Sequence, residues 1–341
     1  MTPGRHSFAV TTGAVLLMVV VFSSAAAPFL APHATDDRFP GLLNAPPTAI
    51  HVEDEAGRWH APFIYQWRRL SQLEQLYEED RSQPVPLAWL TGGRLVVSAD
   101  ESRAPLLLFG ADGFGRDVFA RLLFGARTSL ALALIAALGA TVIGACVGGV
   151  AGFSGGAIDG LLMRGSEFVL VLPATYVALA LRAALPLVLT PPQVFLLLGS
   201  ILAIVGAPSI ARGVRTIVAA ERQQDYIAAA ISLGAGRLRL VLLHLLPATA
   251  GFLVVQLTML VPAFIVAEAT LSYVGLGFPE PVASWGTMLQ DASNLRSIVD
   301  FPWLLSPAAA MFVVVLAVNL LLQRDVRVRA RTRAASGLVL Q

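Results

Sequence analysis

The stretch that decides the fold reads Asp225-Tyr-Ile-Ala-Ala-Ala-Ile-Ser-Leu-Gly234 and continues through residues 235–244 to Leu-Leu-Pro247. It is a polar island between two apolar runs, and its pattern predicts a helix, a glycine break and a second helix. The three consecutive alanines would leave the first helix a nearly bare face that another protein can approach closely. Gly234 lets the chain turn where a Cβ would clash, and Pro247 is expected to end the second helix. We therefore interpret this segment as a docking surface rather than a solvated connector.

Composition places the chain among integral membrane proteins. Of its 341 residues, 56% are hydrophobic and 13% are charged, and the mean hydropathy is +0.71, which is typical of membrane proteins. All 24 basic residues are arginine, so a Walker A loop, a lysine Schiff base and a lysine general base are excluded. The single Cys146 lies in an apolar run and predicts neither a disulfide nor a cysteine metal site. The net charge of +2 gives no indication of nucleic acid, and no cofactor is expected.

Six apolar segments are long enough to cross a bilayer, which takes about 20 residues per helix. They are residues 8–27, 129–152, 158–185, 193–211, 248–274 and 302–323. The first ends in Ala25-Ala-Ala27, which resembles a signal-peptide cleavage site, but its long apolar run favours an uncleaved signal anchor. The predicted fold class is therefore all-α and integral to the membrane, with six transmembrane helices.

The distribution of arginine predicts the orientation. Arginine dominates the loop 212–247 and the tail 324–341, whereas the loop 275–301 carries more acidic than basic residues. Because positively charged short loops stay in the cytoplasm, the loop 212–247 and both termini are predicted to be cytoplasmic. The chain is then a multi-pass protein of the cytoplasmic (inner) membrane, and the segment 28–128 lies outside.

The external segment 28–128 mixes charge, proline and aromatic residues, which predicts a small, partly ordered domain. Helical spacing of the apolar residues Leu70, Leu73, Leu76 and Tyr77 predicts a short helix over roughly 62–80. Four polar residues of this segment are compatible with a metal site, although a solvated loop is the favoured interpretation and no metal is expected. These four are His51, Glu53, Asp54 and His60.

Charged residues inside apolar segments usually face a partner or a water-filled path, since each costs about 2.5–3.5 kcal/mol to insert. Arg164 and Glu167 lie three residues apart, and an ion pair between them is the favoured interpretation. Glu268 lies near the outer end of the fifth span. It would either line a translocation path, together with Ser272, or cap a re-entrant turn, and the sequence leaves both open.

Two further stretches are distinctive. One runs Gly110-Ala-Asp112-Gly-Phe-Gly115-Arg116-Asp117 and continues to Arg121 and Gly125-Ala-Arg127. The other runs Glu268-Ala-Thr-Leu-Ser-Tyr-Val-Gly275-Leu-Gly277 and precedes Ser284-Trp285-Gly286 and Pro302-Trp303. With the loop, they resemble the permease subunit of type I ABC importers, in the dipeptide/oligopeptide/nickel branch and on the "C" side of the paired permeases. The resemblance covers about 110–325 and leaves 28–109 as an extra extracytoplasmic insertion.

The cytoplasmic motif of that family reads Glu-Ala-Ala, three residues, Gly, nine residues, Ile, any residue and Leu-Pro. The spacing is intact here, with Ala228 in place of the glutamate and His244 in place of the isoleucine. The resemblance implies that this loop couples the permease to an ATPase. The residues that it assigns to the coupling loop are Asp225, Tyr226, Ala228, Ala229, Ala230, Gly234, Arg237, His244 and Pro247.

The resemblance also implies the organisation and partners of the chain. It predicts an N-terminal signal-anchor helix (1–27), an extracytoplasmic insertion with an interfacial segment (28–128), a transmembrane permease core (129–323) containing the loop 212–247, and a cytoplasmic tail (324–341). The expected partners are two ATPase subunits, a second homologous permease, an extracytoplasmic substrate-binding protein and membrane lipid.

The implied function is ATP-driven import of peptides or similar small solutes, with hydrolysis on the partner subunits and none on this chain. The alternative is an ATP-independent secondary transporter. That class requires an ion or proton site within the membrane and usually an internal repeat, and the sequence indicates neither. The cargo stays open between a dipeptide, an oligopeptide, nickel and another small solute.

Overall fold

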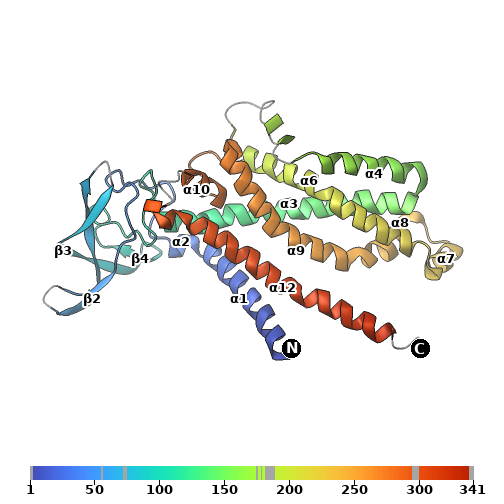
Figure 1. Cartoon of the computed structure of the whole chain (residues 1–341), viewed down its shortest axis with the longest axis horizontal. Coiled ribbons are helices and arrows are strands. Elements are labelled where there is room, and N and C mark those ends of the chain that lie inside the picture. The colour runs from blue at the N-terminus through green and yellow to red at the C-terminus, as the bar shows by residue number, and fades with distance from the viewer. Residues whose placement is uncertain are drawn as a thin grey trace. The chain divides into compact units, whose positions relative to one another are not determined.

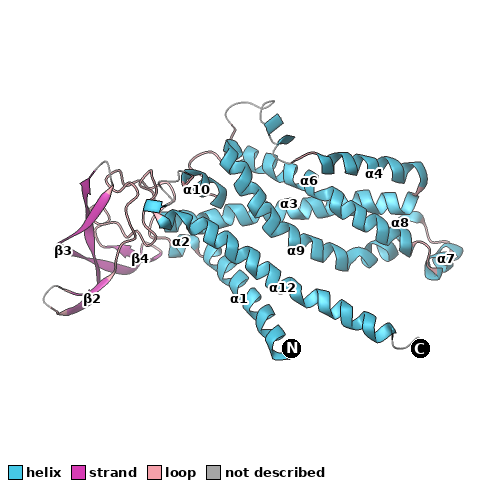
Figure 2. Ribbon diagram, viewed as in Figure 1, coloured by secondary structure: helices cyan, strands magenta, loops and turns pink. Residues whose placement is uncertain are grey.

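The computed structural model describes residues 3–54, 57–71, 75–173, 176–177, 179–180, 189–293 and 299–337. The chain forms two compact units, one made of Met1–Ser129 with Ser272–Gln341 and the other of Leu130–Leu271. Figure 1 labels the elements along the chain, and Figure 2 separates the helices from the strands. Helix α3 (Val118–Ser154) contributes its first residues to the first unit and the remainder to the second.

The elements of the first unit, besides the start of α3, are α1 (Pro3–Ala25), α2 (Ala27–Leu30), β1 (His51–Glu53), β2 (Trp59–Ser71), β3 (Leu76–Thr91), β4 (Arg94–Ser98), the π-helix η2 (Ser272–Leu276), α10 (Trp285–Asp291), the 3-10 helix η3 (Pro302–Leu305) and α12 (Ser306–Gly337). Those of the second unit, besides the rest of α3, are α4 (Gly156–Val171), α6 (Pro191–Glu221), α7 (Asp225–Ser232), α8 (Arg237–Leu240), the π-helix η1 (Val241–Leu245) and α9 (Leu246–Leu271).

Four helical stretches among the described residues are long and apolar enough to cross a membrane. They are Val118–Ser154, Pro191–Glu221, Leu246–Leu276 and Pro302–Leu322. Helix α1 carries a shorter apolar part, Ala9–Ala25. Helix α4 covers the beginning of the predicted span 158–185, of which residues 174–175, 178 and 181–185 lie outside the described residues. A helical membrane protein is thus confirmed, and the count of six spans stays a prediction.

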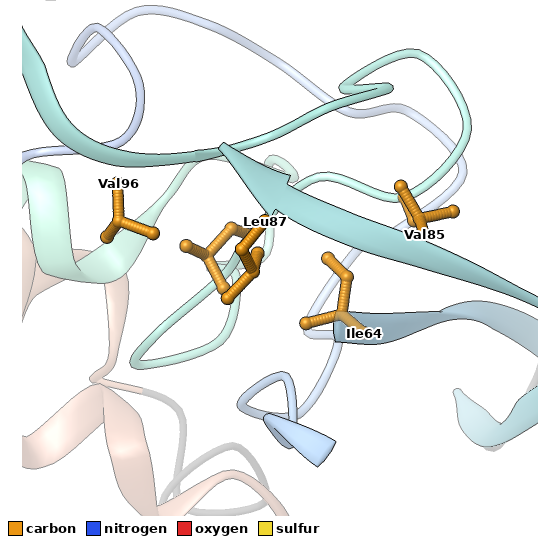
Figure 3. Packing of buried hydrophobic residues seen from close by; sticks show 6 residues of the cluster. Ile64, Val85, Leu87 and Val96 are labelled. Carbon is orange, nitrogen blue, oxygen red and sulfur yellow. The ribbon is translucent and has the colours of Figure 1, made fainter. Parts of the chain in front are cut away.

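The prediction of an all-α chain is wrong for the segment 28–128, which contains a β-sheet. The sheet is antiparallel and has four strands in the order β1-β2-β3-β4. In the register of the two longest strands, Phe63 lies opposite Pro86 and Trp67 opposite Glu79. The core of this sheet is Ile64, Val85, Leu87 and Val96 with Ala104 and Leu106, and Figure 3 shows its side chains.

The helix expected over 62–80 does not form, because its apparent apolar face spans two strands. Leu70 is the penultimate residue of β2 and Leu76 begins β3, and their side chains are 59% and 52% exposed. In β3 the burial follows the period of two that a strand requires, with Val85 and Leu87 inside and Pro86 exposed between them. Leu73 lies outside the described residues.

Helices α1 and α12 pack side by side and run in opposite directions (Figure 1). Their contact is close at Gly13, where an added Cβ would lie 2.7 Å from the carbonyl oxygen of Ala317 and 2.9 Å from Cβ of Leu320. Glycine at this position therefore allows the two backbones to approach, as small residues do between membrane helices.

Helices α3 and α6 of the second unit are held together by a row of glycines. A Cβ on Gly144 would lie 2.7 Å from the carbonyl oxygen of Ala207, and one on Gly152 would lie 2.7 Å from that of Arg215. Gly148, between them, meets the carbonyl oxygen of Ala211. Because both sets of residues ascend together in steps of four, the two helices run parallel and touch along one face.

Candidate functional site: the loop 221–247 and a buried charge cluster

Helix α6 passes into the predicted docking segment through a short turn. The backbone N–H of Gln224 donates to the carbonyl of Glu221, and α7 begins at the next residue. The hydroxyl of Tyr226 donates to Oε2 of Glu221 at 2.8 Å. This bond raises the pKa of Tyr226 and ties the first turn of α7 to the end of α6.

Gly234 ends α7 in the way that the sequence predicts. Its φ is +84°, the left-handed conformation that glycine adopts without steric cost. The N–H of Gly234 donates to the carbonyl of Ile231, and the N–H of Ala235 donates to that of Ala230. These two bonds make a Schellman motif, which satisfies the last carbonyls of the helix and gives the break a defined geometry.

One side of α7 is anchored and the other is free. Ile227 is only 1% exposed, whereas Ala228 and Ala229 are exposed and Ala230 is half-buried. Large apolar side chains are exposed at the end of the helix, with Leu233 at 89%. Helix α7 and its end therefore expose both small and large apolar residues.

The second half of the segment differs from the prediction at Pro247. Helix α8 continues through the π-helix η1 into α9, and Pro247 is the second residue of α9 rather than the end of a helix. The N–H of Leu246 donates to the carbonyl of Val241, five residues back. This wide turn just before the proline accommodates the residue that lacks an N–H, as π-turns within helices commonly do.

The remaining residues predicted in this loop are placed as follows. Asp225 is exposed in the first turn of α7, and Arg239 is exposed on α8. Arg237 lies at the start of α8 and His244 within η1, but their side chains lie outside the described part of the chain.

Glu268 and Ser272, predicted for a translocation path, are both buried. Glu268 is 1% exposed near the end of α9, and Ser272 is fully buried at the start of η2. The chain packs tightly after η2, because a Cβ on Gly277 would lie 2.5 Å from Oγ of Ser272. Gly275, in between, has a φ of +85° and breaks the helical conformation.

Two of the distinctive sequence stretches meet in the first unit. The indole Nε1 of Trp303 donates to the carbonyl of Ala111 at 3.0 Å, and that of Trp285 donates to Leu122 at 3.0 Å. The backbone N–H of Trp285 also donates to Oγ of Ser129. The segment before α3 and the segment around α10 are therefore joined by tryptophans that the sequence had singled out.

A buried arginine lies at this junction. Arg116 is 1% exposed and donates from Nε to Asp112 at 2.6 Å, from Nη1 to Glu280 at 2.6 Å and from Nη2 to Asp291 at 2.7 Å. Arg121 is fully buried beside it, with Nη2 at 3.6 Å from Oδ2 of Asp291. The sequence pointed to the Gly110–Asp117 stretch, but carboxylates more than 160 residues away along the chain gave no local signal.

The two carboxyl groups that come from far along the chain, Glu280 and Asp291, have pKa values shifted in opposite directions. Burial raises the pKa of Asp291, and the attraction of Arg116 and Arg121 does not fully offset it. Burial acts in the same direction on Glu280, but the hydrogen bond and charge of Arg116 outweigh it, and the pKa of Glu280 is lowered. Glu280 is the better ionic partner of Arg116, and its side chain is half exposed.

One further sequence interpretation is corrected. Within the described ranges, no ion pair joins Arg164 and Glu167, which are both exposed on α4. The neighbouring Asp159 pairs with Arg215 of α6 instead, from Nη2 at 2.5 Å.

The candidate metal residues of the sheet do not converge. His51 contacts Glu79 at 3.0 Å, and His60 contacts Asp54 at 2.9 Å. The part of the chain that the structure describes holds no group of three metal-binding side chains. His60 and Asp54 instead line an open pocket of about 490 Å³, together with Phe63 and Tyr65.

These features describe a chain with several long apolar helices, and comparison with known proteins identifies its family. Residues 140–329 match the family described as "Binding-protein-dependent transport system inner membrane component". The chain is 40% identical over 237 residues to the dipeptide transport system permease protein DppC of Bacillus subtilis, covering 68% of this chain and 69% of that protein. It is 35% identical over 225 residues to the oligopeptide transport system permease protein OppC of the same organism, covering 66% and 71%.

The chain belongs to this family of inner membrane transport components. The resemblance inferred from the sequence is thereby confirmed, and family membership makes the chain a transport permease rather than an enzyme. The family's description also implies a separate binding protein as partner. The matched residues begin at 140, so the sheet lies outside them.

Proposed function

We propose that this chain is the permease subunit through which an ATP-driven importer moves peptides or similar small solutes across the cytoplasmic membrane. The observation that carries the proposal is the capped α7 helix, with its exposed alanines and the left-handed Gly234. Peptides are favoured as cargo because the relatives named above are dipeptide and oligopeptide permeases. Membership of a binding-protein-dependent family argues against the alternative of a secondary transporter.

The proposed orientation places the loop 212–247 and both termini in the cytoplasm. The arginine bias of the loop and of the tail 324–341 supports it. So does the antiparallel pairing of α1 with α12, which brings the beginning of α1 and the end of α12 to the same end of the pair. The insertion 28–128 then lies outside, between a signal-anchor helix (1–27) and the permease core (129–323).

In the proposed mechanism, a groove on an ATPase subunit receives α7 and α8. The small side chains Ala228 and Ala229 permit close backbone approach, exposed Leu233 supplies apolar area, and Arg239 offers charge at the rim. Closure of two ATPase subunits on ATP would displace this helix pair. The Schellman bonds and the Tyr226–Glu221 bond would transmit the displacement as a rigid movement into α6 and α9.

The remaining partners follow from the same proposal. A second homologous permease would complete the pathway, and membrane lipid would surround the spans. The binding protein would meet the insertion 28–109, whose pocket of about 490 Å³ is lined by aromatic residues and by charged residues of both signs. Glu268 and Ser272 are proposed to shape the pathway from positions beneath its surface, since both are buried in this subunit.

Two substitutions at Gly234 test the coupling proposal. Gly234→Val places a β-branched residue at φ +84°, where it is strongly strained, whereas Gly234→Asn is tolerated in the left-handed region. We expect Gly234→Val to lower ATP-dependent uptake at least tenfold in proteoliposomes, with the ATPase subunits uncoupled or undocked. We expect Gly234→Asn to retain most uptake.

Nothing lies within 4 Å of the Cβ position of Gly234, so the two variants differ in backbone strain and not in local crowding. Unaltered uptake by Gly234→Val would contradict a rigid coupling segment. A functional complex purified without a second permease would contradict the proposed pairing of permeases.

A further inference from the structure

Arg121 is a buried cation without a hydrogen bond to the described protein groups. It lies in the first turn of α3 and is fully buried. Its Nε, Nη1 and Nη2 atoms make no hydrogen bond to any of the residues that the structure describes. A buried guanidinium in this condition is costly, since buried polar groups are nearly always hydrogen-bonded. Such an exception calls for a physical reason.

The carboxylates nearest to Arg121 are the three that Arg116 already holds. The distances from Arg121 are 3.8 Å to Asp112, 3.9 Å to Glu280 and 3.6 Å to Asp291. The corresponding distances from Arg116 are 2.6, 2.6 and 2.7 Å. A shift of about 1 Å would bring Arg121 within hydrogen-bonding distance of the same oxygens.

There is a void beside Arg121 at this place. A cavity of about 10 Å³ is lined by Arg121, Asp112 and Asp291, together with Met288 and Leu304. It is about large enough for one water molecule. The head group of Arg121 therefore borders a small void that Asp291 also lines.

Helix α3 connects this cluster to the part of the chain that would move. Residues 118–129 belong to the first unit, and the rest of α3 belongs to the second unit, which also contains α7. This step rests on the function proposed above. An ATPase that displaces α7 would also move α6, and α6 contacts α3 at Gly144 and Gly148. A continuous helix would then carry part of that movement to Arg121.

We propose that Arg121 is a positioning residue that takes over Asp291 and Glu280 from Arg116 when α3 moves during transport. Both arrangements pair one buried arginine with the same carboxylates, so neither leaves a buried carboxylate uncompensated. Two packed arrangements of similar free energy make a bistable joint. In this proposal, Arg121 makes its hydrogen bonds to Asp291 and Glu280 only in the second arrangement.

The substitution Arg121→Met separates this role from a purely structural one. Arg121 makes no hydrogen bond to the described residues, and its carboxylate neighbours are bound more closely by Arg116. An apolar side chain of similar length therefore removes a desolvation cost and leaves those carboxylates paired with Arg116. The complex assembled with its partner subunits should therefore melt at the same or a higher temperature. If Arg121 has a second position in the cycle, uptake into proteoliposomes should nevertheless fall at least fivefold, and the amount of solute moved per ATP hydrolysed should fall with it.

Arg164→Met serves as the matched control, because Arg164 is exposed on α4, and it should leave uptake unchanged. Unchanged uptake by Arg121→Met would overturn the inference. A lower melting temperature or loss of the assembled complex would also overturn it, because Arg121 would then stabilise the present arrangement. Absence of ATP-dependent uptake by the wild-type complex would contradict the proposed function itself and the inference with it.

Discussion

The two ends of α3 are held in opposite ways. At its beginning, Arg116 and Arg121 lie buried among three carboxylates, and charge decides what packs there. Toward its end, Gly144, Gly148 and Gly152 bring the helix into backbone contact with α6. One helix thus combines a joint that depends on pairing of charges with a joint that depends on the absence of side chains.

This difference determines which substitutions each end of α3 tolerates. A buried ion pair is strongly destabilised when one partner is removed, because the other charge is left uncompensated. A glycine contact is indifferent to charge but sensitive to volume, because backbone atoms cannot yield as a flexible side chain does. The effects of substitutions on stability should therefore differ between the two ends, both in magnitude and in physical cause.

The largest effect is expected at Arg116. Arg116→Gln would remove the cation that hydrogen-bonds Asp112, Glu280 and Asp291 and leave them only Arg121, at 3.6–3.9 Å. Breaking a buried pair typically costs about 3–5 kcal/mol. The lower end of this range applies, since Glu280 and Asp291 are 50% and 24% exposed. Denaturant unfolding of the purified subunit in detergent would measure the loss.

Glu280→Gln is the control for this prediction. It removes one carboxylate and leaves Arg116 two partners, so its effect should be clearly smaller. If Arg116→Gln is as stable as the wild type, the cluster does not hold the junction. The claim that charge pairing stabilises the beginning of α3 would then be wrong.

The sequence predicted the segment 225–234 well because its signals are local. A helix that ends at a glycine needs only the residues of one turn to satisfy its carbonyls, and the Schellman bonds of Gly234 and Ala235 are made within α7. The same local reasoning was wrong at Pro247. Whether a proline ends a helix or is accommodated depends on the width of the preceding turn, and η1 supplies a wide one.

The sheet and the charge cluster lay beyond such reasoning. Strand pairing joins Phe63 to Pro86, 23 residues on, and an apolar spacing that crosses the intervening turn imitates a helix. Arg116 finds Glu280 and Asp291 only after the chain has folded. The motif around Arg116 marked the place, but its partners are set by tertiary structure and cannot be deduced from spacing.

An intermediate effect is expected in the glycine row. A Cβ at Gly148 would meet the carbonyl oxygen of Ala211, whereas the nearest atom to a Cβ at Gly149 is a side-chain carbon of Leu246 at 3.9 Å. Gly148→Ala should destabilise by about 1–3 kcal/mol through overpacking. Gly149→Ala should be neutral or stabilise by up to about 1 kcal/mol, because alanine favours helix.

The same unfolding measurement compares these two neighbouring substitutions under identical conditions. Their difference isolates the backbone contact from helix propensity, which is common to both. Equal stabilities for the two alanine variants would mean that α3 and α6 can separate without cost, and the second half of the contrast would fail.

The smallest effect is expected at the ion pair between Asp159 and Arg215. Its geometry is good, with Nη2 at 2.5 Å and Nε at 3.0 Å from the carboxylate, yet the arginine side chain is 41% exposed. Exposed pairs contribute little, because water screens the attraction and ordering two side chains costs entropy. Asp159→Asn should therefore leave the melting temperature close to that of the wild type.

Salt separates this pair from the buried cluster more sharply than temperature does. Any small stabilisation by Asp159 and Arg215 should vanish as the ionic strength rises from about 0.1 M to 1 M, where the screening length falls from about 10 Å to 3 Å. The loss caused by Arg116→Gln should persist over that range, since buried charges are screened much less. If both losses decline together with added salt, the Arg116 cluster is hydrated, and the beginning of α3 is held by packing rather than by buried charge.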